Sequence, residues 1–194
     1  MLIGFAIGNG TSRIGFDYSL IDGIGTTVGC NQIHDDYSPD IVVSLDSEPL
    51  KRIHEIPDRD FALMTWDDDR ENIEIEGTPV MGYADVNEGY SFNSGIIACS
   101  YLAKVEKVEK LYMIGFDFFR LIPGMKTNEI GTGQLVRGLN VDTAFNKLFV
   151  DCPDTEFIRV GPIHTTQFDF FFNRMKNVTY QYKYPRGNDA TIRV

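Results

Sequence analysis

The chain has 194 residues and a formal net charge of −10. Its length suits one α/β domain with a substantial core, and no Pro/Ser-rich linker divides it, so we predict a single domain over residues 1–194. The acidic balance argues against broad binding to duplex DNA or RNA, which needs a basic surface, and no apolar stretch reaches the length of a membrane span.

The first residues and the cysteines together predict a cytoplasmic location. Residues 1–7 are apolar but carry no basic residue and continue directly into a Gly-Asn loop, so we expect a strand rather than a signal peptide. Cys30, Cys99 and Cys152 are widely spaced and odd in number. This pattern favours reduced, buried thiols over a disulfide or zinc framework.

Three short apolar runs in the first 46 residues each end in a polar loop. Residues 2–7 are followed by Gly8-Asn9-Gly10-Thr11-Ser12-Arg13, residues 26–29 by Cys30-Asn31-Gln32, and residues 40–45 by Asp46. Such runs are typical of parallel strands whose carboxyl ends border a ligand crevice. The pattern predicts a Rossmann-like α/β fold, with a predominantly parallel sheet flanked by helices and a nucleotide site at its carboxyl edge.

The loop at residues 8–13 has side chains suited to a phosphate or ribose. Gly8 and Gly10 give backbone freedom and let a ligand approach the main chain, while Asn9, Ser12 and Arg13 offer hydrogen-bond donors. The loop is not a P-loop, because no Gly-Lys-Ser/Thr follows, and it lacks the third glycine of the dinucleotide fingerprint. An anion nest and an ordinary tight turn are both open interpretations.

Residues 47–55 have a weak helical pattern, and residues 61–66 resemble a strand that ends at Asp67-Asp68-Asp69. In many glycosyltransferases an Asp-x-Asp after a strand holds a divalent ion against a nucleotide-sugar diphosphate. A solvated acidic turn has the same composition, and we favour that interpretation. The loop-rich residues 73–90 leave room for a small β excursion.

A second group of candidate ligand residues precedes an apolar helix expected over residues 96–103. Asn93, Ser94 and Gly95 would lie at the start of this helix, where free N–H groups suit a phosphate. Simple N-capping by Asn93 or Ser94 explains the same residues equally well.

Residues 110–115 are predicted to form a buried strand that ends in Gly115-Phe116-Asp117. We expect this strand and residues 156–160 to join the runs at 2–7, 26–29 and 40–45 in one sheet. Asp117 would then lie at the same edge as Asn9 and Asn31, where its carboxylate can accept hydrogen bonds from a base or ribose. Capping of the following loop is the alternative.

The last part of the chain is rich in aromatic residues, with Tyr180, Tyr182 and Tyr184 alternating as on one face of a strand. Basic residues lie between the aromatic ones, so stacking on nucleic-acid bases is conceivable. We favour a terminal strand and a hydrophobic flap that closes the core or forms a contact in a homo-oligomer.

Several of these motifs, in this order, resemble the bacterial sialyltransferases that use CMP-sialic acid. The matching segments are Gly8-Asn9-Gly10 with Ser12, Asp17-Tyr18-Ser19, Cys30-Asn31-Gln32, Ser94-Gly95 and Gly115-Phe116-Asp117-Phe118. The same skeleton is similar to the pterin diphosphokinase-like family of archaeal and bacterial proteins and its short phage-encoded relatives, above all over residues 27–46. The resemblance covers roughly residues 2–46 and 91–160.

The resemblance implies roles for particular residues. It assigns Asn9 and Asn31 to the CMP part of the donor, and Ser94 and Asp117 to the lining of the nucleotide site. These sialyltransferases need no metal, so the resemblance implies that the chain has no metal cofactor. It thereby weakens the metal interpretation of the acidic run at 67–69.

One departure from the family concerns the catalytic base. The sialyltransferases carry a catalytic histidine in a Gly-His-Ser-Lys-Asn-type loop, but the corresponding segment here, residues 136–142, contains none. Arg137 in that segment can stabilise phosphate charge but cannot accept a proton at neutral pH. His164 is the candidate replacement, with His34 in reserve, although a lone histidine near a strand end is more often structural.

Three functional hypotheses follow. The leading one is a glycosyltransferase-like protein that binds CMP or another nucleotide sugar. Its acceptor, a small molecule or a glycan, would enter the site from the side of the segment around 120–140. The second is ATP-dependent diphosphate transfer, with Asp46 and Asp117 holding Mg²⁺. The third is a non-catalytic protein that binds or sequesters a nucleotide.

Overall fold

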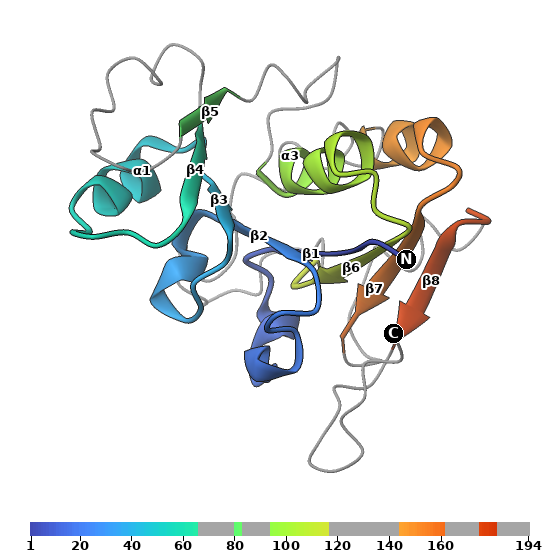
Figure 1. The fold of residues 1–194 in the computed structure, drawn as a ribbon, viewed down its shortest axis with the longest axis horizontal. Helices are drawn as coiled ribbons and strands as arrows, with labels where there is room; N and C mark the ends of the chain where they lie inside the picture. Colours follow the sequence, from blue (N-terminus) through green and yellow to red (C-terminus); the bar gives the residue numbers. More distant parts are fainter. Residues whose placement is uncertain (66–79, 83–93, 117–143, 162–174, 182–194) are drawn as a thin grey trace, which may run out of the picture.

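The structure is a computed structural model that describes residues 1–65, 80–82, 94–116, 144–161 and 175–181. These residues form an α/β fold around one sheet whose strands all run parallel (Figure 1). The predicted Rossmann-like fold class is therefore confirmed. None of the described helices has the length and apolar character that a membrane crossing requires.

The sheet has eight strands in the order β5-β4-β3-β2-β1-β6-β7-β8. Their bounds are β1 Ile3–Ile7, β2 Thr26–Cys30, β3 Ile41–Val43, β4 Ala62–Thr65, β5 Val80–Gly82, β6 Lys110–Ile114, β7 Glu156–Val160 and β8 Val178–Gln181. The first half of the chain builds outward from β1 in one direction and the second half builds outward from β6 in the other. The strand order therefore reverses between β1 and β6, where parallel sheets open a crevice at their carboxyl edge.

Side chains of alternate strand residues fill two apolar layers, one on each face of the sheet. Phe5 and Tyr112, on neighbouring strands, stack with ring centroids 5.2 Å apart on one face. Ala6 and Met113 face the opposite layer. Because both faces are covered, the strands read as continuous apolar runs rather than alternating ones, which is why the sequence signalled parallel strands.

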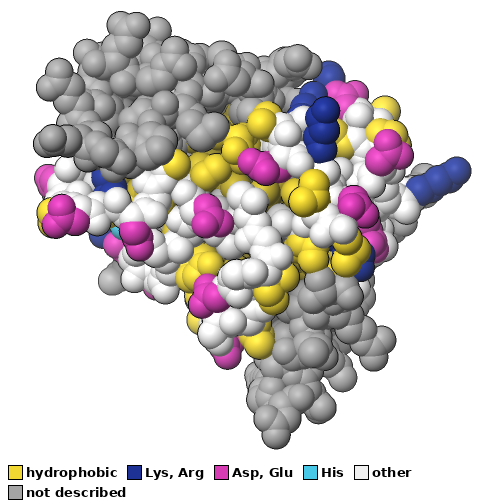
Figure 2. All heavy atoms as spheres, in the orientation of Figure 1, with side chains coloured by type: hydrophobic (Ala, Val, Ile, Leu, Met, Phe, Trp, Pro, Cys, Tyr) yellow, Lys and Arg dark blue, Asp and Glu magenta, His cyan; other side chains and the backbone are white. Residues whose placement is uncertain are grey.

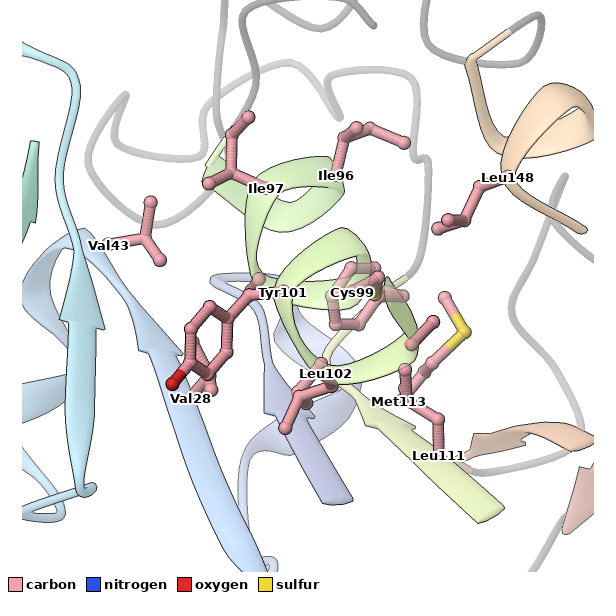
Figure 3. Packing of buried hydrophobic residues seen from close by; sticks show 14 of the residues in the cluster. Val28, Val43, Ile96, Ile97, Cys99, Tyr101, Leu102, Leu111, Met113 and Leu148 are labelled. Carbon is pink, nitrogen blue, oxygen red and sulfur yellow. The ribbon is translucent and has the colours of Figure 1, made fainter. Parts of the chain in front are cut away.

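Helix α3 (Ser94–Ser100) continues as a π-helical turn, Tyr101–Val105, and covers one face of the sheet together with a helix over residues 144–151. Figure 3 shows Tyr101 beside Val28, and Leu102 on the sheet side of the helix. The opposite face is covered by α1 (Ser47–His54) and by the 3-10 turns η2 (Tyr18–Leu20) and η3 (Asn31–Asp35). A further 3-10 turn, η1 (Thr11–Arg13), follows β1.

Most predicted elements agree with these bounds. The helix expected at 47–55 is α1, and the strand expected at 61–66 is β4. The helix expected at 96–103 begins two residues earlier, at Ser94, and its second half is π-helical rather than α-helical. Tyr180 lies in β8 as predicted, whereas Tyr182 and Tyr184 fall outside the described residues.

On the face shown in Figure 2, acidic side chains are spread across the described surface, while lysines and arginines stand mainly near its margins. This distribution agrees with the overall charge of −10. A broad basic footprint for duplex nucleic acid is not what this face presents.

The three cysteines differ in their access to solvent. Cys30 and Cys99 are buried and Cys152 is partly exposed, and all three are free thiols. Burial raises the pKa of the Cys30 thiol to about 12 and raises that of Cys99 well above its ordinary value. Burial also raises the pKa of Cys152, but part of its surface remains accessible.

We therefore predict selective alkylation of Cys152. Only the thiolate reacts, so iodoacetamide at pH 8 should modify Cys152 slowly in the native protein and reach Cys30 and Cys99 only after unfolding. Peptide mapping by mass spectrometry measures the sites, and Cys152→Ser should abolish the native-state label. Labelling of Cys99 at the rate of Cys152 would contradict the described packing.

Candidate functional site at the carboxyl edge of the sheet

Polar residues from four neighbouring strands meet in one row at the carboxyl edge. The register pairs Ile7 with Gly29, and Asn9 and Asn31 each follow two residues further on, just past the ends of β1 and β2. Gly29 pairs with Val42 and Val43 pairs with Met64, which places Ser44 and Thr65 in the same row. A hydrogen bond of 3.0 Å from the N–H of Ser44 to the carbonyl of Met64 agrees with this alignment of Ser44 and Thr65. We call Asn9, Asn31, Ser44 and Thr65 the polar row.

Three members of the polar row have a buried oxygen without a hydrogen-bond partner among the residues that the structure describes. These atoms are Asn9 Oδ1, Ser44 Oγ and Thr65 Oγ1. Ser44 and Thr65 are 0% exposed. Buried polar atoms are almost always satisfied in folded proteins, and exceptions gather where a ligand or water completes the bonding. The row therefore has hydrogen-bonding capacity that its own side chains do not use.

Asn31 occupies a conformation that few residues tolerate. Its φ angle is +51°, in the left-handed region where asparagine is several-fold enriched over other side chains apart from glycine. It begins η3, and its side-chain Oδ1 accepts a hydrogen bond of 3.3 Å from Ser94 Oγ at the start of α3. Two residues 63 positions apart, each predicted separately as a ligand contact, are thus brought together.

Ser94 and Gly95 are buried at the first turn of α3. The hydroxyl of Ser94 donates to the Asn31 side chain, so it orients an asparagine of the polar row. From the sequence, Ser94 was expected either to contact a ligand or to cap the helix. The hydrogen bond to Asn31 was not expected. Asn93, the other candidate cap, lies outside the described residues.

The glycines of the first loop have a different role from the one predicted. The N–H groups of Gly8 and Gly10 donate to the carbonyls of Ile114 and Gly115, at 2.8 and 2.9 Å, so these two donors are not free to cradle an anion. Gly8 has no positive φ. A Cβ placed on it would lie 2.7 Å from the carbonyl oxygen of Gly115. Gly8 is needed for close contact between two strand ends, and the anion-nest interpretation does not hold for these N–H groups.

Arg13, predicted as a phosphate donor, forms an ion pair within the protein. Its Nη1 donates to Asp36 Oδ2, directly after η3, and lies 3.5 Å from the hydroxyl of Tyr18. Burial lowers the pKa of Arg13, but the hydrogen bonds and charges of Asp36 and Tyr18 outweigh it and raise the pKa overall. The guanidinium remains protonated, and its charge is largely engaged by Asp36.

Ser12 and Arg159 lie together on the β7 side of the crevice. Ser12 is buried, and its Cβ lies 3.3 Å from the place that a Cβ on Gly161 would take. The Nη2 of Arg159 lies 3.1 Å from the same place, and Arg159 is fully buried. Sequence reasoning missed Arg159, although a single arginine inside an apolar strand is a visible signal. It likewise missed Ser44 and Thr65, each of which is the next-to-last residue of an expected strand.

His34, the reserve candidate for the base, is held by its own turn. Its Nδ1 lies 3.0 Å from the carbonyl oxygen of Asn31, and its Nε2 lies 3.5 Å from Asp35 Oδ1. The side chain is only 6% exposed. These contacts give His34 a structural role in η3.

Other candidates fall outside the described residues: Asp117, His164, Arg137 and the acidic run at 67–69. Asp117 directly follows the described residue Phe116, which is buried and packs edge-on against Phe145. Asp46 precedes α1 and makes no side-chain cap. Among the residues that the structure describes, no three His, Cys, Asp or Glu side chains form a metal-binding group.

Comparison with solved structures identifies the fold. The sialyltransferase CstII from Campylobacter jejuni, in complex with the substrate analogue CMP-3FNeuAc, matches with a TM-score of 0.56 at 15% identity over 88% of this chain and 85% of that one. CstII with a trisaccharide acceptor and CMP matches with a TM-score of 0.55 at 16% identity, over 97% and 92%. The chain has the sialyltransferase fold.

An α-2,3-sialyltransferase from the same organism in apo form gives a TM-score of 0.56 at 15% identity, over 94% of this chain and 83% of that one. No protein-family model matches the chain. No curated protein matches it either. The second resemblance, to the pterin diphosphokinase-like proteins, stays a prediction.

The contact between Gly8 and Gly115 yields a stability prediction. Gly8→Ala would force the strand ends apart, so we expect it to lower the free energy of unfolding by about 1–3 kcal/mol. Urea denaturation measures this change. Lys51→Ala on the exposed side of α1 is the control, with an expected change within about 0.5 kcal/mol. A Gly8→Ala variant as stable as the wild type would show that the strand ends have room for a side chain.

Proposed function

We propose that this chain is a glycosyltransferase-like protein that binds a nucleotide or nucleotide sugar of the CMP type at the carboxyl edge of the sheet. The observation that carries the proposal is the polar row, with its unpartnered buried oxygens beside the reversal of strand order. The likeness in fold supports the proposal, because CstII is described in complex with CMP and with CMP-3FNeuAc.

In this proposal the ligand is recognised by neutral hydrogen-bonding groups. Asn9 and Asn31 would bind the nucleotide, because an asparagine amide both donates and accepts. Ser94 would hold Asn31 in place, and Gly95 would keep the start of α3 close to the ligand. Asp117 would accept hydrogen bonds from the base or ribose. Ser12 would line the β7 side, and the main chain at Gly8 and Gly10 would form the floor.

Transfer would need a base for the acceptor. The acceptor hydroxyl would attack the anomeric carbon of the donor sugar and form the new glycosidic bond, while the bond to the nucleotide phosphate breaks and CMP leaves. A base takes the hydroxyl proton, and His164 is proposed for that role. Because His34 is held within η3, it is the weaker candidate.

A titration with CMP, UDP and ATP, each with and without Mg²⁺, tests the proposal against its alternatives. Preference for CMP independent of Mg²⁺, with release of CMP from a CMP-sugar, supports the transferase. Preference for ATP only with Mg²⁺ would favour the diphosphokinase hypothesis. CMP binding without turnover would favour the non-catalytic hypothesis, and no binding of any nucleotide would refute the proposal.

Asn31 provides the sharpest test of binding. Asn31→Ala and Asn31→Gly both remove the amide, so each should weaken CMP binding by about 1–3 kcal/mol in calorimetry. Only alanine is strained at positive φ, so Asn31→Ala should also unfold at lower urea while Asn31→Gly should not. Unchanged affinity in Asn31→Gly would remove this side chain from the site.

His164 tests catalysis. If it is the base, His164→Ala should lower turnover of a CMP-sugar by roughly 100-fold or more without weakening CMP binding, because a positioned general base contributes about that factor. His54→Ala, at the exposed end of α1, is the matched control and should keep full turnover. Full turnover in His164→Ala would dismiss His164 as the base.

A further inference from the structure

We propose that Arg13 is a positioning residue: its side chain braces the carboxyl ends of β6, β1 and β2 so that Asn9 and Asn31 stand at the spacing a ligand requires. The inference rests on the proposed function for the identity of the ligand. The contacts of Arg13 itself do not depend on that function. It replaces the expectation that Arg13 itself contacts a phosphate.

The course of the Arg13 side chain supports a brace. Arg13 ends η1, in the loop that follows β1. Its Cβ lies 3.3 Å from the place that a Cβ on Gly115 would take, at the end of β6. Its guanidinium reaches Asp36, which follows η3 and therefore belongs to the loop after β2. One side chain thus spans three strand ends, and Asn9, Asn31 and Asp117 each follow one of those strands.

The charge of Arg13 also acts at the end of β2. Burial raises the pKa of the Cys30 thiol, and the positive charge of Arg13 opposes that rise. Cys30 is the last residue of β2 and directly precedes Asn31. The charge of Arg13 is therefore felt at the residue that directly precedes Asn31.

One partner of Arg13, Tyr18, is held by aromatic packing. Tyr18, which lies 3.5 Å from the guanidinium, stacks on Tyr37 with ring centroids 4.8 Å apart at an angle of 14°. The hydroxyl of Tyr37 donates to Asp22 at 3.0 Å. Isolated surface ion pairs are weak because holding long side chains in one geometry costs conformational entropy. Packing of this kind lowers that cost. The Arg13 side chain is 19% exposed, against 51% for Arg52 in the neighbouring pair, whereas Asp36 is 50% exposed, so solvent screens the Arg13–Asp36 pair mainly from the side of its carboxylate.

A neighbouring ion pair offers a matched control. Arg52 on α1 pairs with Asp35 of η3 at 3.1 Å, with both side chains about half exposed at 51% and 47%. This pair touches the same turn but does not reach the loop after β1. Arg52→Gln removes one positive charge near η3, as Arg13→Gln does, but leaves the contact between Arg13 and Asp36 in place.

The test is a double-mutant cycle with two readouts. Calorimetry measures CMP affinity in Arg13→Gln, Asp36→Asn and the double variant, with Arg52→Gln as control. Hydrogen exchange measures the amides of Asp36 and Tyr37, which both donate to the carbonyl of Ile33 at 2.9 Å. A brace predicts about tenfold weaker CMP binding in each single variant, no further loss in the double variant, and less than twofold change in the control. It also predicts at least tenfold faster exchange in both single variants.

Two other patterns of CMP binding would overturn the inference. Weaker binding in Arg13→Gln with unchanged binding in Asp36→Asn would mean that Arg13 contacts the ligand directly. Effects that add in the double variant would show that the two residues act independently. If the wild type binds no nucleotide, the proposed function fails, but exchange still decides the brace: unchanged exchange in both single variants would refute it, and faster exchange would support it.

Discussion

The approach of two backbones at Gly8 and Gly115 is the constraint on which the carboxyl edge depends. A Cβ at Gly8 would lie 2.7 Å from the carbonyl oxygen of Gly115, and one at Gly115 would lie 2.5 Å from the carbonyl oxygen of Gly8. Gly115 also has a φ of +75°, which other side chains rarely adopt. Because β1 and β6 are the strands between which the chain reverses its direction of growth, this contact sets how the two halves of the sheet meet. The loops that carry Asn9 and Asp117 both start from it.

Around this contact, the charged side chain of Arg13 and the neutral polar side chains of the polar row have different partners. Arg13, the cation of the first loop, is engaged by Asp36 beneath the strand ends. The polar row above is built from amides and hydroxyls, with Ser94 holding Asn31 in place. Neutral groups discriminate a ligand by the geometry of its donors and acceptors rather than by its charge. The net charge of −10 opposes an anionic nucleotide at long range, so hydrogen bonds at short range would have to supply its recognition.

The sequence predicted the strands well because parallel strands buried on both faces leave a strong local signal: short apolar runs that stop at glycine, asparagine or aspartate. The same local signal located Asn9, Asn31 and Ser94 as residues at strand or helix ends. It could not show that Ser94 donates to Asn31, 63 residues away, nor that Arg13 reaches Asp36 rather than solvent. Ser44 and Thr65 were missed because each lies inside an expected strand and belongs to no motif. Only the register across β2, β3 and β4 shows that they share a row.

The π-helical turn after α3 affects how this chain is aligned with others. In that turn the N–H of Glu106 donates to the carbonyl of Tyr101, five residues earlier, so the turn holds one residue more than an α-helical turn. The extra residue shifts the helical phase, and the buried residues before and after it still face the sheet. A homologue with a regular α-helix here would differ in length by one residue inside the helix. The gap in their alignment would then belong in the last turn of the helix, and an alignment that moves the gap into the loop before β6 would misplace the residues in between.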